Sequence, residues 1–124
     1  MTIRKILTFP DPKLREVAKE VTEFNSDLKS LAEDLIETMY EFKGIGLAAV
    51  QIGVNKRVIV ADVSEEKKEP FIFINPTIKI LNEDEKGGYD EGCLSIPGFY
   101  EEVIRPTQVE ISFQNLSGEN EKII

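Results

Sequence analysis

One amphipathic helix followed only by strand-like segments is the feature that most restricts how this chain can fold. Apolar residues recur at spacings of three and four in the first third of the sequence, which is the period of an α-helix with one buried face. Those residues are Leu28, Leu31, Leu35, Met39 and Phe42. Asn25 or Ser26 can cap the start of this helix, and Gly44 stands where a glycine commonly ends one.

The segments on either side complete the outline of the fold. A shorter helix is expected to start at Pro12, because Asp11 suits an N-cap and proline suits the first helical position. The later segments are β-branched and apolar, or alternate in polarity, as strands do. The expected strands are 57–63, 71–74, 77–81, 100–103 and 108–113, with another beginning at 121. Asn75-Pro76 separates the second from the third, and residues 82–88 form an acidic loop. N-terminal helices followed by antiparallel strands predict an α+β fold.

Length and charge limit the size and the class of the protein. The 124 residues suffice for one domain with one core. The sequence stops inside the last expected strand, so we expect a single, truncated domain over residues 1–124 without a C-terminal helix to cover the sheet. The net charge of −8 argues against a nucleic-acid partner. No apolar segment is long enough to span a membrane, and the N-terminus does not resemble a signal peptide.

The cysteine and histidine counts exclude several kinds of site. The single cysteine, Cys93, cannot form an internal disulfide and fits a reducing compartment. The sequence contains no histidine, so these residues cannot form a Ser-His-Asp triad, a Cys-His dyad or a histidine-ligated metal site.

Two segments differ from ordinary core sequence. Residues 44–53 carry Gly46, which has no capping role, and Gln51, a single amide among apolar neighbours. Gln51 either points to water in a tight connection or acts as a fixed donor in a substrate-facing loop. Residues 89–98 carry Cys93 after two carboxylates. A free cysteine is most often a small buried apolar residue, and the functional alternatives are a nucleophile or a metal ligand.

Taken together, these segments resemble the first two signature motifs of peptide deformylases. The motifs are GIGLAAVQIG at 44–53 and EGCLSIP at 91–97, and FPDPKLR at 9–15 and VIRP at 103–106 are also similar to that family. The resemblance implies an α+β metallohydrolase that removes the formyl group from the N-terminal methionine of new polypeptides. The family uses Fe²⁺ and often tolerates Zn²⁺ or Ni²⁺.

The resemblance also implies roles at the reaction centre. Cys93 would be the thiolate ligand of the metal. The side-chain amide of Gln51 and the backbone N–H of Leu94 would hold the oxyanion that forms when a metal-bound hydroxide attacks the formyl carbonyl.

Further roles follow for substrate binding and for the surroundings of the metal. Ile45, Gly46 and Gly92 would pair with the extended peptide by main-chain hydrogen bonds, and Ile45 would help to line the methionine pocket. Glu91 and Arg105 would form an ion pair that stiffens the loop around Cys93.

The sequence departs from the family in one respect. The third family motif, H-E-x-x-H on a C-terminal helix, supplies two histidine ligands and a glutamate that acts as general acid and base, and it is absent here. We therefore expect this chain alone to be inactive or very weak and not to hold the metal stably. Our preferred interpretation is a partial peptide deformylase. The alternatives are a non-catalytic module that keeps the peptide groove, and a fragment whose open sheet face docks a partner or another copy.

The same resemblance defines the expected partners and location. The ligands would be N-terminal formyl-methionyl peptides, with no nucleic acid and no membrane involved. The expected location is the bacterial cytoplasm, with an organelle as the alternative.

Overall fold

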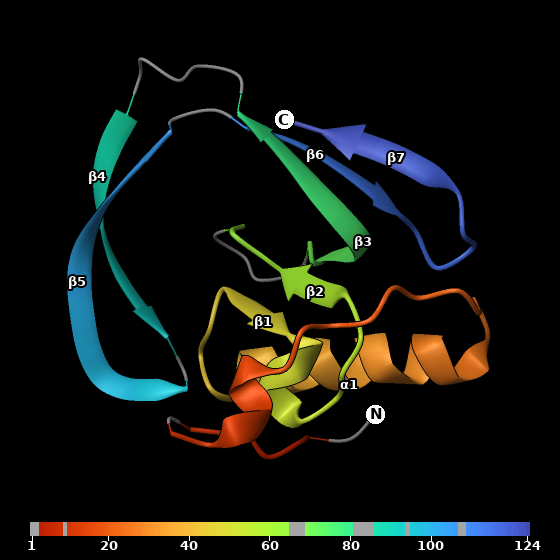
Figure 1. The fold of residues 1–124 in the computed structure, drawn as a ribbon, viewed down its shortest axis with the longest axis horizontal. Helices are drawn as coiled ribbons and strands as arrows, with labels where there is room; N and C mark the ends of the chain where they lie inside the picture. The colour runs from red at the N-terminus through yellow and green to blue at the C-terminus, as the bar shows by residue number, and fades with distance from the viewer. Residues whose placement is uncertain (1–2, 9, 65–68, 81–85, 94, 107–108) are drawn as a thin grey trace.

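The computed structural model describes residues 3–8, 10–64, 69–80, 86–93, 95–106 and 109–124, with 86–93 and 96–106 described by their backbone. In these parts of the chain, two 3-10 helices, one α-helix and seven strands follow one another (Figure 1). They are η1 (Pro12–Arg15), α1 (Ser26–Glu41), β1 (Gly46–Ala48), η2 (Ala49–Ile52), β2 (Val58–Ala61), β3 (Phe71–Ile80), β4 (Lys86–Cys93), β5 (Ile96–Pro106), β6 (Val109–Gln114) and β7 (Asn120–Ile123).

The strands form two antiparallel sheets. Five of them pair in the order β1-β2-β3-β6-β7, and β4 pairs with β5 in a separate hairpin. In Figure 1 this hairpin stands on the side opposite to β6 and β7. Helices followed by antiparallel strands confirm the expected α+β class.

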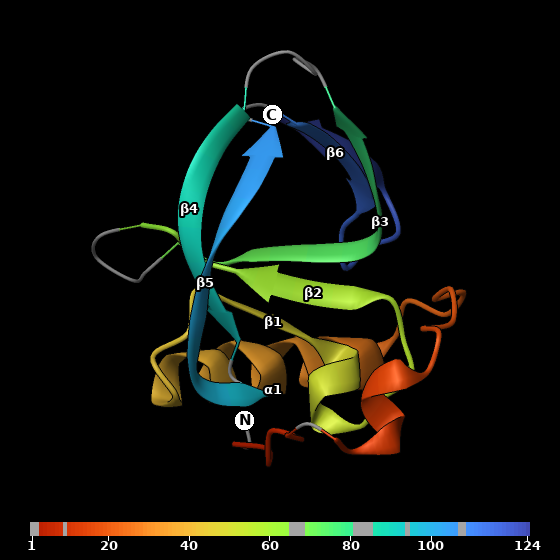
Figure 2. The ribbon, with the colours of Figure 1, turned by 60° about the vertical axis from the view of Figure 1, so that its left-hand side comes forward.

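The core lies between α1 and one face of the larger sheet. Figures 1 and 2 both show α1 running beneath β1 and β2. Alternate strand residues face the helix, and they pack with its apolar stripe in one cluster. The main members of this cluster are Leu28, Leu31, Leu35, Met39, Leu47, Val58, Val60 and Ile74. Burying these side chains is the main stabilising term for a helix on a sheet.

The opposite face of the larger sheet carries a row of aromatic contacts. The rings of Phe71 and Phe73 stack with centroids 5.7 Å apart, and Phe113 meets Phe73 edge-on at 4.8 Å. Phe73 and Phe113 are buried, but Phe71 and Ile78 on the same strand are exposed. This face is therefore only partly covered by the described residues.

One expected interruption is a bulge inside a longer strand. Asn75-Pro76 was expected to separate two strands, but β3 runs from Phe71 to Ile80, and its register against β6 shifts between Ile74 and Thr77. Figure 2 shows the bend in this strand. Proline has no N–H to donate to a ladder, so a bulge is one of the few places where a strand accepts it. Asn75 lies there in the left-handed region with φ 52°.

Other boundaries also differ from the sequence predictions. Strand β4 was not predicted, and its start at Lys86 lies inside the expected acidic loop, of which residues 82–85 are outside the described residues. The sequence did not predict this strand because it contains glycines at 87, 88 and 92, and glycine is a poor strand former. The strand predicted at 100–103 is the middle of the longer β5, and residues 44–53 hold β1 and η2.

The capping of α1 follows the sequence at its start but not at its end. Asn25 is the N-cap, and its side chain accepts a hydrogen bond from Leu28 N. At the other end Lys43, not Gly44, takes the left-handed position, with φ 57°. Lys43 N donates to Tyr40 O and Gly44 N donates to Met39 O, which is a Schellman motif shifted by one residue. Phe42, placed in the buried stripe by its spacing, is 46% exposed.

We predict that Lys43→Gly stabilises the protein. A lysine in the left-handed region costs about 1 kcal/mol that a glycine does not, so the urea midpoint should rise by an amount equivalent to about 1 kcal/mol. Gly44→Ala is the control, since Gly44 is not among the residues with positive φ. An unchanged midpoint in Lys43→Gly would contradict the assignment of the cap.

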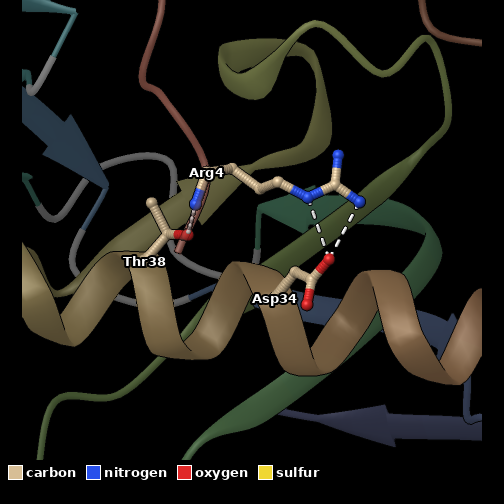
Figure 3. Close-up of polar contacts among 3 residues, drawn as sticks. All are labelled: Arg4, Asp34 and Thr38. Carbon is tan, nitrogen blue, oxygen red and sulfur yellow. Dashed lines mark hydrogen bonds and ion pairs between the residues drawn. The ribbon is translucent and has the colours of Figure 1, made fainter. Parts of the chain in front are cut away.

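The N-terminal segment is fastened to α1 by one arginine. Arg4 Nε and Nη2 lie 2.9 and 2.8 Å from Asp34 Oδ2, and Arg4 N donates to Thr38 Oγ1 at 2.8 Å (Figure 3). Asp34 lies outside the apolar stripe of α1, but it is buried. A buried carboxylate needs a charged partner, and Arg4 supplies it.

Candidate functional site

The site is built around Gln51, which is held from two sides by backbone groups. Gln51 lies in η2, and its backbone oxygen accepts a hydrogen bond from Leu7 N at 2.7 Å. Its side-chain Oε1 accepts from Ala48 N at 3.0 Å. The N-terminal segment and the start of η2 therefore fix both the backbone and the side chain of this residue. Gln51 is therefore partly buried and hydrogen-bonded within the fold, and its role as a donor to a substrate remains a prediction.

The nitrogen of the same amide reaches the second motif. Gln51 Nε2 donates to Ser95 Oγ at 3.1 Å. Ser95 lies in the turn that closes the β4–β5 hairpin, between the register partners Cys93 and Ile96, and it is only 4% exposed. The hydrogen bond joins two segments separated by 44 residues, so the structure brings the two motifs together at the closed end of the hairpin.

A strand edge lies next to this amide. Among the described strands β1 pairs with β2 alone, so it forms one edge of the larger sheet. Ile45, just before β1, is 60% exposed, and its backbone oxygen accepts from Asp62 N at 2.9 Å. A Cβ added to Gly46 would lie 3.6 Å from Val60 O, which is an ordinary contact. The packing of the chain itself therefore does not require glycine at 46.

Asp62, whose backbone N–H bonds Ile45 O at this edge, carries a buried carboxylate. Asp62 is fully buried and accepts hydrogen bonds from Tyr40 Oη, from the N–H and hydroxyl of Ser64, and from Glu69 N. Hydrogen bonds from Ser64 and Tyr40 lower the pKa of Asp62 to about 2. Burial, together with the hydrogen bond to Asp62, raises the pKa of Tyr40 to about 12. Asp62 thus stays ionised and Tyr40 protonated throughout the neutral range.

We predict that Asp62 makes stability fall in acid. Its usual pKa of 3.8 applies to the unfolded chain, and the pKa near 2 applies to the folded one. The carboxylate therefore stabilises the fold fully above pH 3.8, and this contribution is lost as the pH falls towards 2. In Asp62→Asn the urea midpoint should depend less on pH across that window. In Glu23→Gln, at an exposed position, the pH dependence of the midpoint should be unchanged. An equal acid slope in Asp62→Asn and the parent would contradict this role.

The remaining predicted site residues lie on the hairpin or outside the described residues. Gly92 and Cys93 end β4, where they pair with Tyr100 and Ile96. Leu94 lies outside the described residues. The roles predicted for these three residues remain predictions.

The predicted ion pair also lies on the hairpin strands. Glu91 is opposite Glu101, and Arg105 is opposite Gly87, so the two residues are four register positions apart. Their predicted contact remains a prediction.

The described residues do not provide a complete metal site. The described residues contain no group of three or more His, Cys, Asp or Glu side chains that could hold an ion. The whole sequence contains one cysteine and no histidine. Catalytic zinc sites take three protein ligands. One thiolate therefore supplies only one of the three ligands that such a site needs.

Three residues around Gln51 and Ile45 were missed by sequence reasoning. Ser95 stood inside a quoted motif without a role, and Leu7 and Asp62 stood outside both motifs. Only Ser95 carried a signal, since a polar residue between apolar neighbours at a strand end favours a turn. The contact of Leu7 with Gln51 uses backbone atoms, which no sequence pattern marks.

A separate hollow lies on the larger sheet away from Gln51. Its volume is about 580 Å³, and its walls include Arg57, Asn75, Phe113 and Gln114. Arg57 donates to Pro76 O, and Asn75 donates to Gln114 Oε1, so several of its polar groups are engaged within the fold.

Comparison with known proteins agrees with this architecture. The family model for polypeptide deformylase matches residues 3–124. Peptide deformylase from Cellvibrio japonicus is 52% identical over 118 residues, which are 95% of this chain and 69% of that protein. The enzyme from Pseudomonas aeruginosa is also 52% identical over 118 residues, which are 95% of this chain and 70% of that protein.

Solved structures show the same similarity. The crystal structure of peptide deformylase from Thermotoga maritima has a TM-score of 0.91 and 40% identity, over 98% of this chain and 80% of that one. The complex of the Ehrlichia chaffeensis peptide deformylase with actinonin has a TM-score of 0.92 and 36% identity, over 99% and 74% of the two chains. These similarities define an α+β protein of a hydrolase family. The chain belongs to the peptide deformylase family.

Within the part of the chain that the structure describes, none of the helices combines the length and the apolar character needed to cross a bilayer.

Proposed function

We propose that this chain forms the formyl-peptide-binding part of a peptide deformylase. The substrate would be the N-terminal formyl-methionyl group of a nascent polypeptide, and the reaction its hydrolysis to formate and a free amine. The observation that carries the proposal is the hydrogen bond from Gln51 Nε2 to Ser95 Oγ, because it brings the two family motifs to one place. We infer a single domain over residues 1–124 and a cytoplasmic location, in keeping with the bacterial relatives.

Gln51 would be the donor to the developing oxyanion, together with the backbone N–H of Leu94. Its amide is already oriented by Ala48 N and Ser95 Oγ, so it would need no reorganisation when charge develops. In other enzymes, removal of one such donor costs on the order of 10²–10³ in rate.

The edge of β1 would bind the peptide backbone. Ile45 and Gly46 lie at an edge that a further strand can extend, and Gly92 would act in the same way from the hairpin. Binding through main-chain groups suits a substrate whose sequence varies beyond the formyl-methionine. The exposed side chain of Ile45 would contact the methionine.

Cys93 would supply the one metal ligand present in the 124 residues, with Fe²⁺, Zn²⁺ or Ni²⁺ as candidate ions. Glu91 and Arg105 would stiffen the loop that carries it. The histidine ligands and the glutamate that acts as general acid and base would have to come from outside these residues, because the sequence contains no H-E-x-x-H motif.

A second candidate function is a non-catalytic module that binds formylated N-termini. The residue content favours it for the chain taken alone, since the donor and the strand edge are present while the ligand set is not. A partner or second copy over the exposed part of the aromatic sheet face, at Phe71 and Ile78, is compatible with either function.

Peptide binding tests the proposal directly. The chain is titrated with formyl-Met-Ala-Ser and with Met-Ala-Ser while its backbone amides are followed by NMR. We expect saturable shifts at residues 45–51 and at the hairpin turn with the formylated peptide, and weaker binding of the unformylated one. Equal affinity for both peptides, or no shift at residues 45–51, would overturn the proposed function.

A further inference from the structure

The orientation of the Gln51 amide decides what this residue can do. A glutamine side chain carries an acceptor oxygen and a donor nitrogen on the same carbon, and a half-turn exchanges them. Only one orientation presents N–H groups to the closed end of the hairpin. The contacts of Gln51 therefore determine whether the site offers a donor or an acceptor.

Two contacts select the orientation seen here. Ala48 N can only donate, so it requires the oxygen of the Gln51 amide at 3.0 Å. Ser95 Oγ then receives the nitrogen at 3.1 Å. A buried amide in the opposite orientation would place its NH₂ group against the backbone N–H of Ala48, which leaves two donors facing each other and costs about 1–3 kcal/mol.

We propose that Ser95 is a positioning residue for Gln51. Its hydroxyl, buried in the hairpin turn, accepts the Nε2 proton and holds the amide with its donor side towards the turn that follows Cys93. Ser95 itself contacts no reacting group in this assignment. The proposal rests on the proposed function in one point only, namely that the Gln51 amide is the donor that the formyl oxygen meets.

A purely structural role for Ser95 makes a different prediction. Ser95 could simply dock the hairpin onto η2, in which case any hydrogen bond between the two side chains would serve. Ser95→Ala separates the two roles, because loss of docking would shift the backbone amides along β4 and β5 as much as the Gln51 amide, whereas loss of positioning would change the Gln51 NH₂ group alone. Gln51→Glu tests the donor itself, because the serine hydroxyl can donate to the new carboxylate and keep the hairpin docked while the amide donor is gone. Unchanged formyl-peptide affinity in Gln51→Glu would contradict the donor role.

The test follows the Gln51 side-chain NH₂ group by NMR in the full ¹⁵N-labelled chain without peptide. In Ser95→Ala we expect its exchange with water to rise about fivefold, as loss of one net hydrogen bond predicts. Ser95→Thr keeps the hydroxyl and should restore slow exchange. Ser117→Ala, in an exposed turn, is the matched control and should change nothing.

The outcomes separate the proposal from its alternatives. Unchanged Gln51 exchange in Ser95→Ala overturns it, and so do backbone shifts along β4 and β5 as large as those of the Gln51 amide. If Ser95→Ala does not fold, the parent decides: a nuclear Overhauser contact between the Gln51 NH₂ and the Ser95 β-protons supports the assignment, and its absence overturns it.

Peptide affinities then distinguish the two proposals. We expect formyl-Met-Ala-Ser to bind about fivefold more weakly to Ser95→Ala and to Gln51→Glu, with Met-Ala-Ser binding equally to all variants. A parent chain that binds neither peptide would refute the proposed function while leaving the exchange result for Ser95 intact.

Discussion

Added Fe²⁺ or Ni²⁺ will not give the 124-residue chain useful deformylase activity. The expected turnover of formyl-Met-Ala-Ser is on the order of 10³-fold or more below that of an intact family member. Catalytic groups that act as a unit lose most of their rate enhancement when any one of them is missing. The sequence offers one cysteine where three ligands are needed, and the described residues contain no other suitable cluster. Formate release is the measurement.

The control for this prediction is a longer relative assayed in parallel. The Pseudomonas aeruginosa peptide deformylase is suitable, since this chain covers 70% of it at 52% identity. Turnover by the 124-residue chain within tenfold of that enzyme would show that its own residues complete a catalytic site. The metal at the site around Gln51 would then have to be held by ligands other than the family's two histidines.

The second large effect is expected at Asn75 in the bulge of β3. Asn75 Oδ1 accepts from Val21 N, and Asn75 Nδ2 donates to Val21 O and to Gln114 Oε1, each at 2.8 Å. Its backbone has φ 52°, which asparagine tolerates better than most residues. Asn75→Ala removes these three hydrogen bonds and places an unsuited residue in the left-handed region. We expect a loss of about 3 kcal/mol in the free energy of unfolding.

Asn75→Gly separates the two contributions. Glycine relieves the backbone but not the loss of the side-chain hydrogen bonds, so it should recover about 1 kcal/mol of the Asn75→Ala effect. Urea unfolding with a constant slope is the measurement. If Asn75→Ala unfolds at the parent midpoint, these hydrogen bonds do not hold the N-terminal segment to the bulge.

Sequence reasoning located most elements because the local patterns were strong. The period of α1, the β-branched run of β2 and the alternating polarity of β6 are properties of the neighbouring residues alone. The errors fell where a distant partner decides the outcome. The sequence of Asn75-Pro76 predicts a break between strands. The hydrogen bonds of Asn75 with Val21 and Gln114, which hold it inside one strand, involve residues far away in the sequence. The burial of Asp34 likewise depends on Arg4, which lies 30 residues away in the sequence.

The candidate site shows the same division. The motifs drew attention to Gln51 and to the segment around Cys93, but their meeting depends on the hairpin folding back onto η2. That contact is made by Ser95, whose sequence context favours a turn but does not indicate which residue it contacts. Likewise, Asp62 N donates to Ile45 O, and Tyr40 Oη donates to the Asp62 carboxylate. These contacts join residues that are distant in the sequence, so no local pattern predicts them.

The placement of Leu7, Ala48 and Ser95 around one residue, Gln51, has a consequence for how the protein is made. Leu7 and Ser95 contact Gln51 from opposite directions along the sequence, so both the preceding and the following chain must close onto it. Such closures carry an entropic cost that local helices do not. On the ribosome, α1 can form early, but the environment of Gln51 is complete only after the hairpin turn has emerged. A newly synthesised chain would therefore acquire secondary structure well before it acquires a recognition surface.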